Sequence, residues 1–160
     1  MRYILFVLTC LFCSVCSGQY IILSTKQGPV GRVARNITGD FYTHSVIVLD
    51  GWVYEQDWPR SRKTPLAFYG KKRTINDIYL LPLTRQQVHL MKQYAESRLG
   101  EPYRLRGYFR PGARTNGTWC SNFVGQILNT GGYQLTPSQM REPENLRQQL
   151  NPQFRYRYRR

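Results

Sequence analysis

Cysteine is nearly absent from this 160-residue chain once its first segment is set aside. Three of the four cysteines, Cys10, Cys13 and Cys16, fall within the first 18 residues, and only Cys120 lies beyond them. The chain after residue 18 therefore cannot form an internal disulfide. In an exported protein, a cysteine left over in this way is a buried apolar residue, an intermolecular partner or a reactive thiol.

The chain also lacks an apolar run of about 20 residues, the length that a membrane-spanning helix needs. Its first 18 residues, MRYILFVLTCLFCSVCSG, contain one basic residue, a shorter apolar run and then small residues. This order is typical of an export signal. We expect cleavage after Gly18 and a secreted or periplasmic protein, while a retained membrane anchor and lipidation of Cys13 or Cys16 stay open as alternatives.

Acidic residues are few, with 9 Asp and Glu against 23 Lys and Arg, for a formal charge of +14. Such a charge favours polyanions. For an exported protein we expect anionic membrane lipid or a cell-wall polymer rather than nucleic acid, although the RYRYRR sequence at 155–160 could stack on bases. A solvated tail or an edge strand is the simpler interpretation, and we assign 151–160 to a basic C-terminal tail.

Metal-binding and phosphate-binding patterns are missing. Two histidines and one cysteine beyond the signal are too few for a zinc site, and no glycine loop suited to a phosphate occurs. We therefore expect no metal and no cofactor. With 41% hydrophobic residues and no internal repeat, residues 19–150 are expected to form one compact domain. We also expect a monomer.

The strand and helix patterns predict an α+β fold with an antiparallel sheet packed against helices. The elements expected before residue 84 are a strand at 19–26, a short helix at 30–37, a hairpin around Asp50-Gly51, a surface loop at 59–74 and a strand at 75–83. Those expected afterwards are a helix from Thr84 to Leu99 with Val88, Met91, Ala95 and Leu99 as its apolar stripe, a helix from Trp119 to Gly131-Gly132, and a short helix after Pro143.

The hairpin suggests partners for one of the two histidines. A two-residue loop at Asp50-Gly51 would put His44, Glu55 and Asp57 on one face, with Glu55 diagonal to His44 and Asp57 opposite it. A carboxylate beside an imidazole fixes its tautomer and raises its basicity, as in catalytic triads. An ordinary cross-strand ion pair is the alternative, and His89 is expected on the polar surface of its helix.

Cys120 begins the apolar helix in GTWCSNFVGQIL. A helix N-terminus stabilises a thiolate, and its free N–H groups can hold an oxyanion. The spacing therefore permits a nucleophile, a base and an orienting carboxylate on one scaffold, with a lone buried cysteine as the alternative.

Three stretches together resemble the circularly permuted papain-like branch of the NlpC/P60 superfamily of cysteine hydrolases. They are YIILSTKQGPVGRVARNITGDFYTHSVIVLDGWVYE, LTRQQVHLMKQYAESRLGEPY and WCSNFVGQIL. The resemblance implies Cys120 as nucleophile, His44 as general base and Glu55, in preference to Asp57, as orienting residue. It also implies that Tyr103 lies near the substrate cleft.

The same resemblance implies an exported amidase or peptidase whose substrate is a cell-envelope peptide or an N-acyl or lipid-linked amide. Lecithin:retinol acyltransferase-like enzymes share the permuted fold, but typically have a second histidine where Glu55 stands and NCEHFV where WCSNFV stands. A lipid acyltransferase or phospholipase is therefore the second hypothesis. A non-catalytic envelope-binding module is the third.

Overall fold

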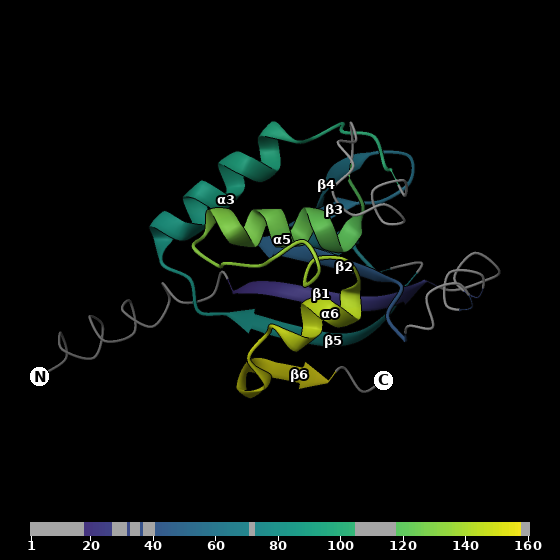
Figure 1. The fold of residues 1–160 in the computed structure, drawn as a ribbon. Helices are drawn as coiled ribbons and strands as arrows, with labels where there is room; N and C mark the ends of the chain where they lie inside the picture. The colour runs from purple at the N-terminus through teal and green to yellow at the C-terminus, as the bar shows by residue number, and fades with distance from the viewer. Residues whose placement is uncertain are drawn as a thin grey trace, which may run out of the picture.

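The computed structural model describes residues 18–26, 32, 36, 41–70, 73–104 and 118–157. The expected export signal and the short helix at 30–37 lie almost wholly outside these residues. Within them the chain forms one antiparallel sheet and three α-helices, so the α+β expectation is confirmed (Figure 1).

The sheet has six strands in the order β4-β3-β2-β1-β5-β6, and every neighbouring pair is antiparallel. The strands are β1 Gln19–Lys26, β2 His44–Leu49, β3 Trp52–Gln56, β4 Ser61–Pro65, β5 Arg73–Leu81 and β6 Arg155–Arg157. Two 3-10 turns, η2 Leu66–Phe68 and η3 Pro152–Phe154, follow β4 and precede β6.

The β2–β3 hairpin has the predicted register. Asp50 and Gly51 have φ angles of 49° and 76°, which a two-residue hairpin loop requires and which glycine and aspartate tolerate. Leu49 therefore pairs with Trp52, and Val48 with Val53. Glu55 is thereby carried to the end of the hairpin at which His44 begins β2.

The prediction of a surface loop at 59–74 is wrong, because residues Ser61–Pro65 form strand β4 on the edge of the sheet. Its sequence SRKTP lacks the apolar alternation that predicts a strand. Lysine, arginine and proline are nevertheless suited to an edge strand, where one side of the backbone stays unpaired. At the other edge, β6 pairs with Asp77–Tyr79 of β5, so the edge-strand interpretation of the basic C-terminus holds for Arg155–Arg157.

The helices are α3 Arg85–Ser97, α5 Cys120–Thr130 and α6 Pro143–Gln148. Thr84 caps α3 in a capping box with Gln87, as its sequence predicts. Leu99 was wrongly placed in the apolar stripe of α3: the helix ends at Ser97, and Leu99 is 40% exposed. The helix at Cys120 and the one at Pro143 begin within one residue of their predicted starts, Trp119 and the residue after Pro143.

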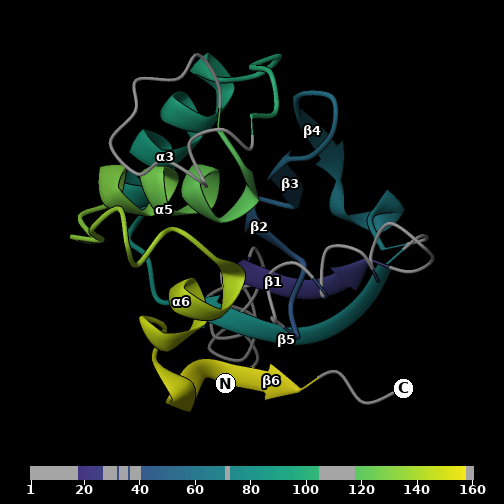
Figure 2. The same ribbon diagram turned by 45° about the vertical axis from the view of Figure 1, so that its right-hand side comes forward.

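All three helices cover one face of the sheet, as the two ribbon views show (Figures 1 and 2). Their apolar side chains pack in a single core with Ile21, Ile47 and Tyr54 of the sheet. The other face carries a smaller cluster of Ile22, Val46, Val48 and Val53, which residues of η2 and β5 partly cover. This smaller cluster lies on the face toward which His44 and Glu55 alternate.

Candidate active site

The predicted general base and the predicted nucleophile are each the first residue of a secondary-structure element. His44 is the first residue of β2 and is 3% exposed, while Cys120 is the first residue of α5 and is 5% exposed. Helix α5 packs along β2, so the starts of the two elements come together (Figure 1). There the Cys120 thiol lies beside the His44 imidazole, close enough for each group to shift the pKa of the other.

Glu55 contacts the imidazole ring of His44 at Nε2. Its Oε2 lies 2.9 Å from His44 Nε2, and the carboxylate is 2% exposed. Because Glu55 occupies Nε2, Nδ1 is the ring nitrogen that remains available to the thiol. Burial raises the pKa of Glu55, but its hydrogen bond and charge interaction with His44, together with Arg62 and Arg73, lower it to about 2. Glu55 is therefore ionised at neutral pH and can hold a protonated imidazole.

The electrostatics of the pair favour an ionised thiol. Burial raises the pKa of Cys120, but the hydrogen bond and charge of His44 and the backbone N–H groups of Ser45 and Ser121 leave it lowered. Burial and the charge of Arg73 lower the pKa of His44, while its hydrogen bonds to Cys120 and Glu55 leave it raised. Both directions stabilise a thiolate beside an imidazolium.

The N-terminus of α5 supplies donors for a second negative charge. Trp119 is its N-cap residue and makes no side-chain capping bond, while the Thr118 hydroxyl hydrogen-bonds to Asn122 instead. The N–H groups of the first turn therefore have no side-chain cap competing for them. They lie next to the sulfur, where an oxyanion would form if the thiolate attacked a carbonyl.

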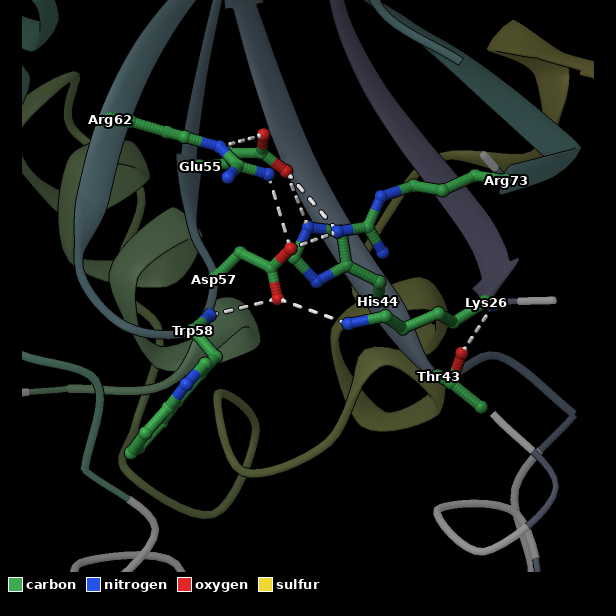
Figure 3. Close-up of polar contacts among 8 residues, drawn as sticks. All are labelled: Lys26, Thr43, His44, Glu55, Asp57, Trp58, Arg62 and Arg73. Atoms are coloured by element: carbon green, nitrogen blue, oxygen red, sulfur yellow. Dashed lines mark hydrogen bonds and ion pairs between the residues drawn. The ribbon is translucent and has the colours of Figure 1, made fainter. Parts of the chain in front are cut away.

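Asp57, the alternative partner of the imidazole, is engaged elsewhere (Figure 3). Its Oδ2 lies 2.5 Å from Arg73 Nη2 and 3.2 Å from Arg62 Nη2, and its Oδ1 lies 3.8 Å from Lys26 Nζ. Glu55 is thus the carboxylate that hydrogen-bonds His44, while Asp57 binds the surrounding cations.

Arg62 and Arg73 are site residues that the sequence did not reveal. Arg62 Nε lies 2.7 Å from Glu55 Oε1, and Arg73 Nη2 lies 3.5 Å from Glu55 Oε2. Arg62 lies in the stretch that was taken for a loop, so no strand register was available for it. The alternation of β4 against β3, which pairs Arg62 with Glu55, is the signal that would have found it.

Tyr103 lies beside the segment that leads into Cys120. Its N–H donates to the carbonyl of Pro59 at 2.9 Å, and it forms an isolated parallel bridge with Thr118. The tyrosine is half-buried. Its expected place near a substrate stays a prediction. His89, by contrast, is exposed on α3, as expected for a surface residue.

Comparison with known proteins adds no relative: no family model and no curated protein matches the chain. Within the described residues, no three His, Cys, Asp or Glu side chains gather as a metal site would require. No helix in that same part of the chain is long and apolar enough to cross a bilayer.

Proposed function

We propose that the protein is an exported cysteine hydrolase that cleaves an amide bond through Cys120, His44 and Glu55. The observation that carries this proposal is the buried chain of contacts from thiol to imidazole to ionised carboxylate. A buried cysteine with a merely structural role needs no imidazole on its sulfur, and a buried histidine with a merely structural role needs no thiol. The resemblance to permuted papain-like NlpC/P60 enzymes supports the same assignment.

The reaction follows from the roles that these contacts allow. The Cys120 thiolate attacks the carbonyl carbon, and the resulting oxyanion is held by N–H groups at the start of α5. The tetrahedral adduct collapses to a thioester as the His44 imidazolium gives its proton to the departing amine. Neutral His44 then takes a proton from water, which attacks the thioester and releases the carboxylic acid and the thiolate.

The substrate class that fits is a cell-envelope peptide or an N-acyl or lipid-linked amide, acted on by a monomer without metal or cofactor. The formal charge, +14 for the whole chain and +13 once Arg2 is removed with residues 1–18, suits an anionic cell-wall polymer or membrane surface. Residues 1–18 would serve as the export signal and Tyr103 would contact the substrate.

The same charge supports a second candidate, a lipid acyltransferase or phospholipase that works at an anionic bilayer. The chemistry at Cys120 would be identical up to the thioester. In the acyltransferase, a lipid amine or hydroxyl would then accept the acyl group from the thioester. In the phospholipase, water would accept it.

The test is whether a thioester forms on Cys120. Purified protein is mixed with p-nitrophenyl acetate, and the tryptic peptide 115–141, which has Cys120 as its only cysteine, is examined by mass spectrometry. We expect a burst of p-nitrophenol and an acetylated Cys120, both absent in Cys120→Ala. A burst that survives in Cys120→Ala, or no burst at all, contradicts the proposal and leaves an envelope-binding module.

Assays on two natural materials then distinguish between the two candidate substrate classes. Release of new amino groups from isolated bacterial cell wall supports the amidase, and release of fatty acid from phosphatidylglycerol vesicles supports the lipid enzyme. Cys120→Ala is the control in both assays.

A further inference from the structure

Four further charged residues lie around Glu55, the carboxylate that contacts His44, and of these five residues the proposed chemistry uses only Glu55. We call them the charge cluster, and they are Lys26, Glu55, Asp57, Arg62 and Arg73. Figure 3 shows them gathered around the imidazole ring. The two arginines differ in their exposure and in the oxygen of Glu55 that each reaches.

Arg73 shares an oxygen with the imidazole. Its Nη2 lies 3.5 Å from Glu55 Oε2, the atom that is 2.9 Å from His44 Nε2. Its side chain is 8% exposed, so solvent screens its charge little. Arg62 instead reaches Oε1, and its side chain is 48% exposed. Of the two, Arg73 is the one placed to act on the imidazole.

A bulge in β5 gives Arg73 this position. The β1–β5 register runs from Leu23 paired with Asp77 to Ser24 paired with Ile75, so Asn76 is the extra residue. Side chains alternate along a regular strand, and Arg73 would otherwise share the helix-covered face with Asp77. The bulge turns Arg73 and Ile75 to the face of His44, which is a known use of bulges beside active sites.

Asp57 is the closer of the two carboxylates that Arg73 contacts. Arg73 makes its short contact, 2.5 Å, with Asp57 and its longer one with Glu55. Without Asp57, the guanidinium would be free to close on Oε2 and compete with the imidazole for that oxygen. Asp57 also offsets the positive charge that Arg73 places near His44.

We propose that Arg73, held by Asp57, is a positioning residue that keeps Glu55 Oε2 on His44 and sets the pH at which His44 can accept a proton. This inference rests on the proposed role of His44 as the base. The titratable groups around His44 and the charge cluster come from every packed element: Lys26 of β1, Glu55 and Asp57 at the end of β3, Arg62 of β4, Tyr69 after η2, Arg73 of β5 and Cys120 of α5. Burial raises the pKa of Tyr69 to about 12, so it stays neutral throughout the test.

The two substitutions that remove the pair have opposite expected effects. Loss of the positive charge in Arg73→Met favours the imidazolium, and its pH midpoint should rise by about one unit. Loss of the negative charge in Asp57→Asn should lower that midpoint. Arg62→Met is the matched control, and solvent screening should keep its shift below about half a unit.

The midpoint is measured by NMR of the histidine rings, in which only His44 and His89 give signals. A Cys120→Ala background keeps the thiol from titrating alongside. Opposite shifts for Arg73→Met and Asp57→Asn, with the first larger than that of Arg62→Met, support the inference. Any other pattern, including equal shifts for the two arginines, overturns it.

Arg73→Met leaves Asp57 without its closest partner, and this variant could fail to fold. The double variant Arg73→Met/Asp57→Asn leaves neither charge unpaired. Its midpoint should return to within about 0.5 unit of the parent because it removes one positive and one negative charge from the surroundings of the imidazole. If only Asp57→Asn and the double variant fold, a lowered midpoint in the first and its recovery in the second support the inference. Absence of either overturns it.

A kinetic readout separates this inference from the proposed function. Hydrolysis of acetyl-Cys120 needs neutral His44, so the pH midpoint of deacylation in the Cys120 proteins should move with the NMR midpoint. An acyl-enzyme whose deacylation midpoint is unchanged by Arg73→Met and Asp57→Asn overturns the positioning role and leaves the hydrolase intact. Shifted NMR midpoints without any acyl-enzyme instead overturn the hydrolase.

Discussion

Glu55 and Asp77 are two buried carboxylates on opposite faces of the same sheet. Each is 2% exposed, and each is bound by an arginine. Glu55 is hydrogen-bonded to the imidazole of His44. Asp77 accepts a hydrogen bond from the hydroxyl of Tyr42 and lies 2.8 Å from Arg155 Nη2. Besides their arginines, the two carboxylates therefore differ in the group that hydrogen-bonds each of them, an imidazole for Glu55 and a phenol for Asp77.

That hydrogen-bonding group decides what a buried carboxylate does. Burial and the neighbouring Asp77 raise the pKa of Tyr42 to about 12, so neither the phenol nor the guanidinium beside Asp77 exchanges a proton near neutral pH. The Asp77 cluster joins β6 and the segment before β2 to β5, and its role is structural. Beside Glu55 lie an imidazole and a thiol, the two groups that the proposed chemistry requires.

The largest expected effect comes from removing the charge of Glu55. Glu55→Gln should slow acetylation of Cys120 by p-nitrophenyl acetate by about 10²- to 10⁴-fold, because an amide neither stabilises the imidazolium nor fixes its tautomer. Asp77→Asn is the matched control and, at a temperature where it is folded, should keep most of the wild-type rate. Comparable losses in both variants would erase the distinction between the two carboxylates.

Removing the structural carboxylate should mainly affect stability. Asp77→Ala leaves Arg155 and the Tyr42 hydroxyl without this partner, and we expect a loss of about 3 to 5 kcal/mol in the free energy of unfolding. Urea denaturation followed by circular dichroism measures it. A loss below about 1 kcal/mol would show that the Asp77 cluster does not hold β6 to the sheet.

Acid should weaken the protein through Glu55. The pKa of Glu55 is lowered in the folded protein from 4.5 to about 2, so its stabilising contribution is complete above pH 4.5 and disappears as the pH falls toward 2. We expect Glu55→Gln to remove up to about 3 kcal/mol of this pH dependence. The measurement is the difference between the wild-type and variant unfolding free energies across that interval. A constant difference would show that Glu55 is not ionised preferentially in the folded state.

The second histidine provides the smallest effect. His89 is exposed on α3, so His89→Ala should change the free energy of unfolding by less than about 0.5 kcal/mol and leave acetylation of Cys120 unchanged. A rate loss that matches that of His44→Ala would mean that the wrong histidine has been assigned.

Much of the fold could be predicted where local sequence and tertiary environment agree. The strand at 19–26 is strongly apolar, Asp50-Gly51 fixes the register of the hairpin, and α5 has apolar helical periodicity ended by Gly131. These features were enough to bring Glu55 within reach of His44. They could not choose between Glu55 and Asp57, because strand alternation puts both on one face.

The remaining features depend on long-range pairing that leaves no local pattern. Strand β4 exists because its backbone pairs with β3, although its sequence is basic and contains a proline. The bulge at Asn76 reverses the alternation of β5, so counting from Tyr79 would have placed Arg73 on the wrong face. The contact between Cys120 and His44 depends on how α5 packs on the sheet, which no spacing in the sequence specifies.

The state of the Cys120 sulfur tests the central claim most directly. Alkylation by iodoacetamide is followed from pH 4 to 10 on peptide 115–141, in wild type and in His44→Ala. We predict a wild-type pH midpoint well below the value of about 8.5 for a free thiol, and a variant midpoint at or above it. A wild-type midpoint near 8.5 that His44→Ala leaves in place would contradict the thiolate–imidazolium pair on which the proposed activity depends.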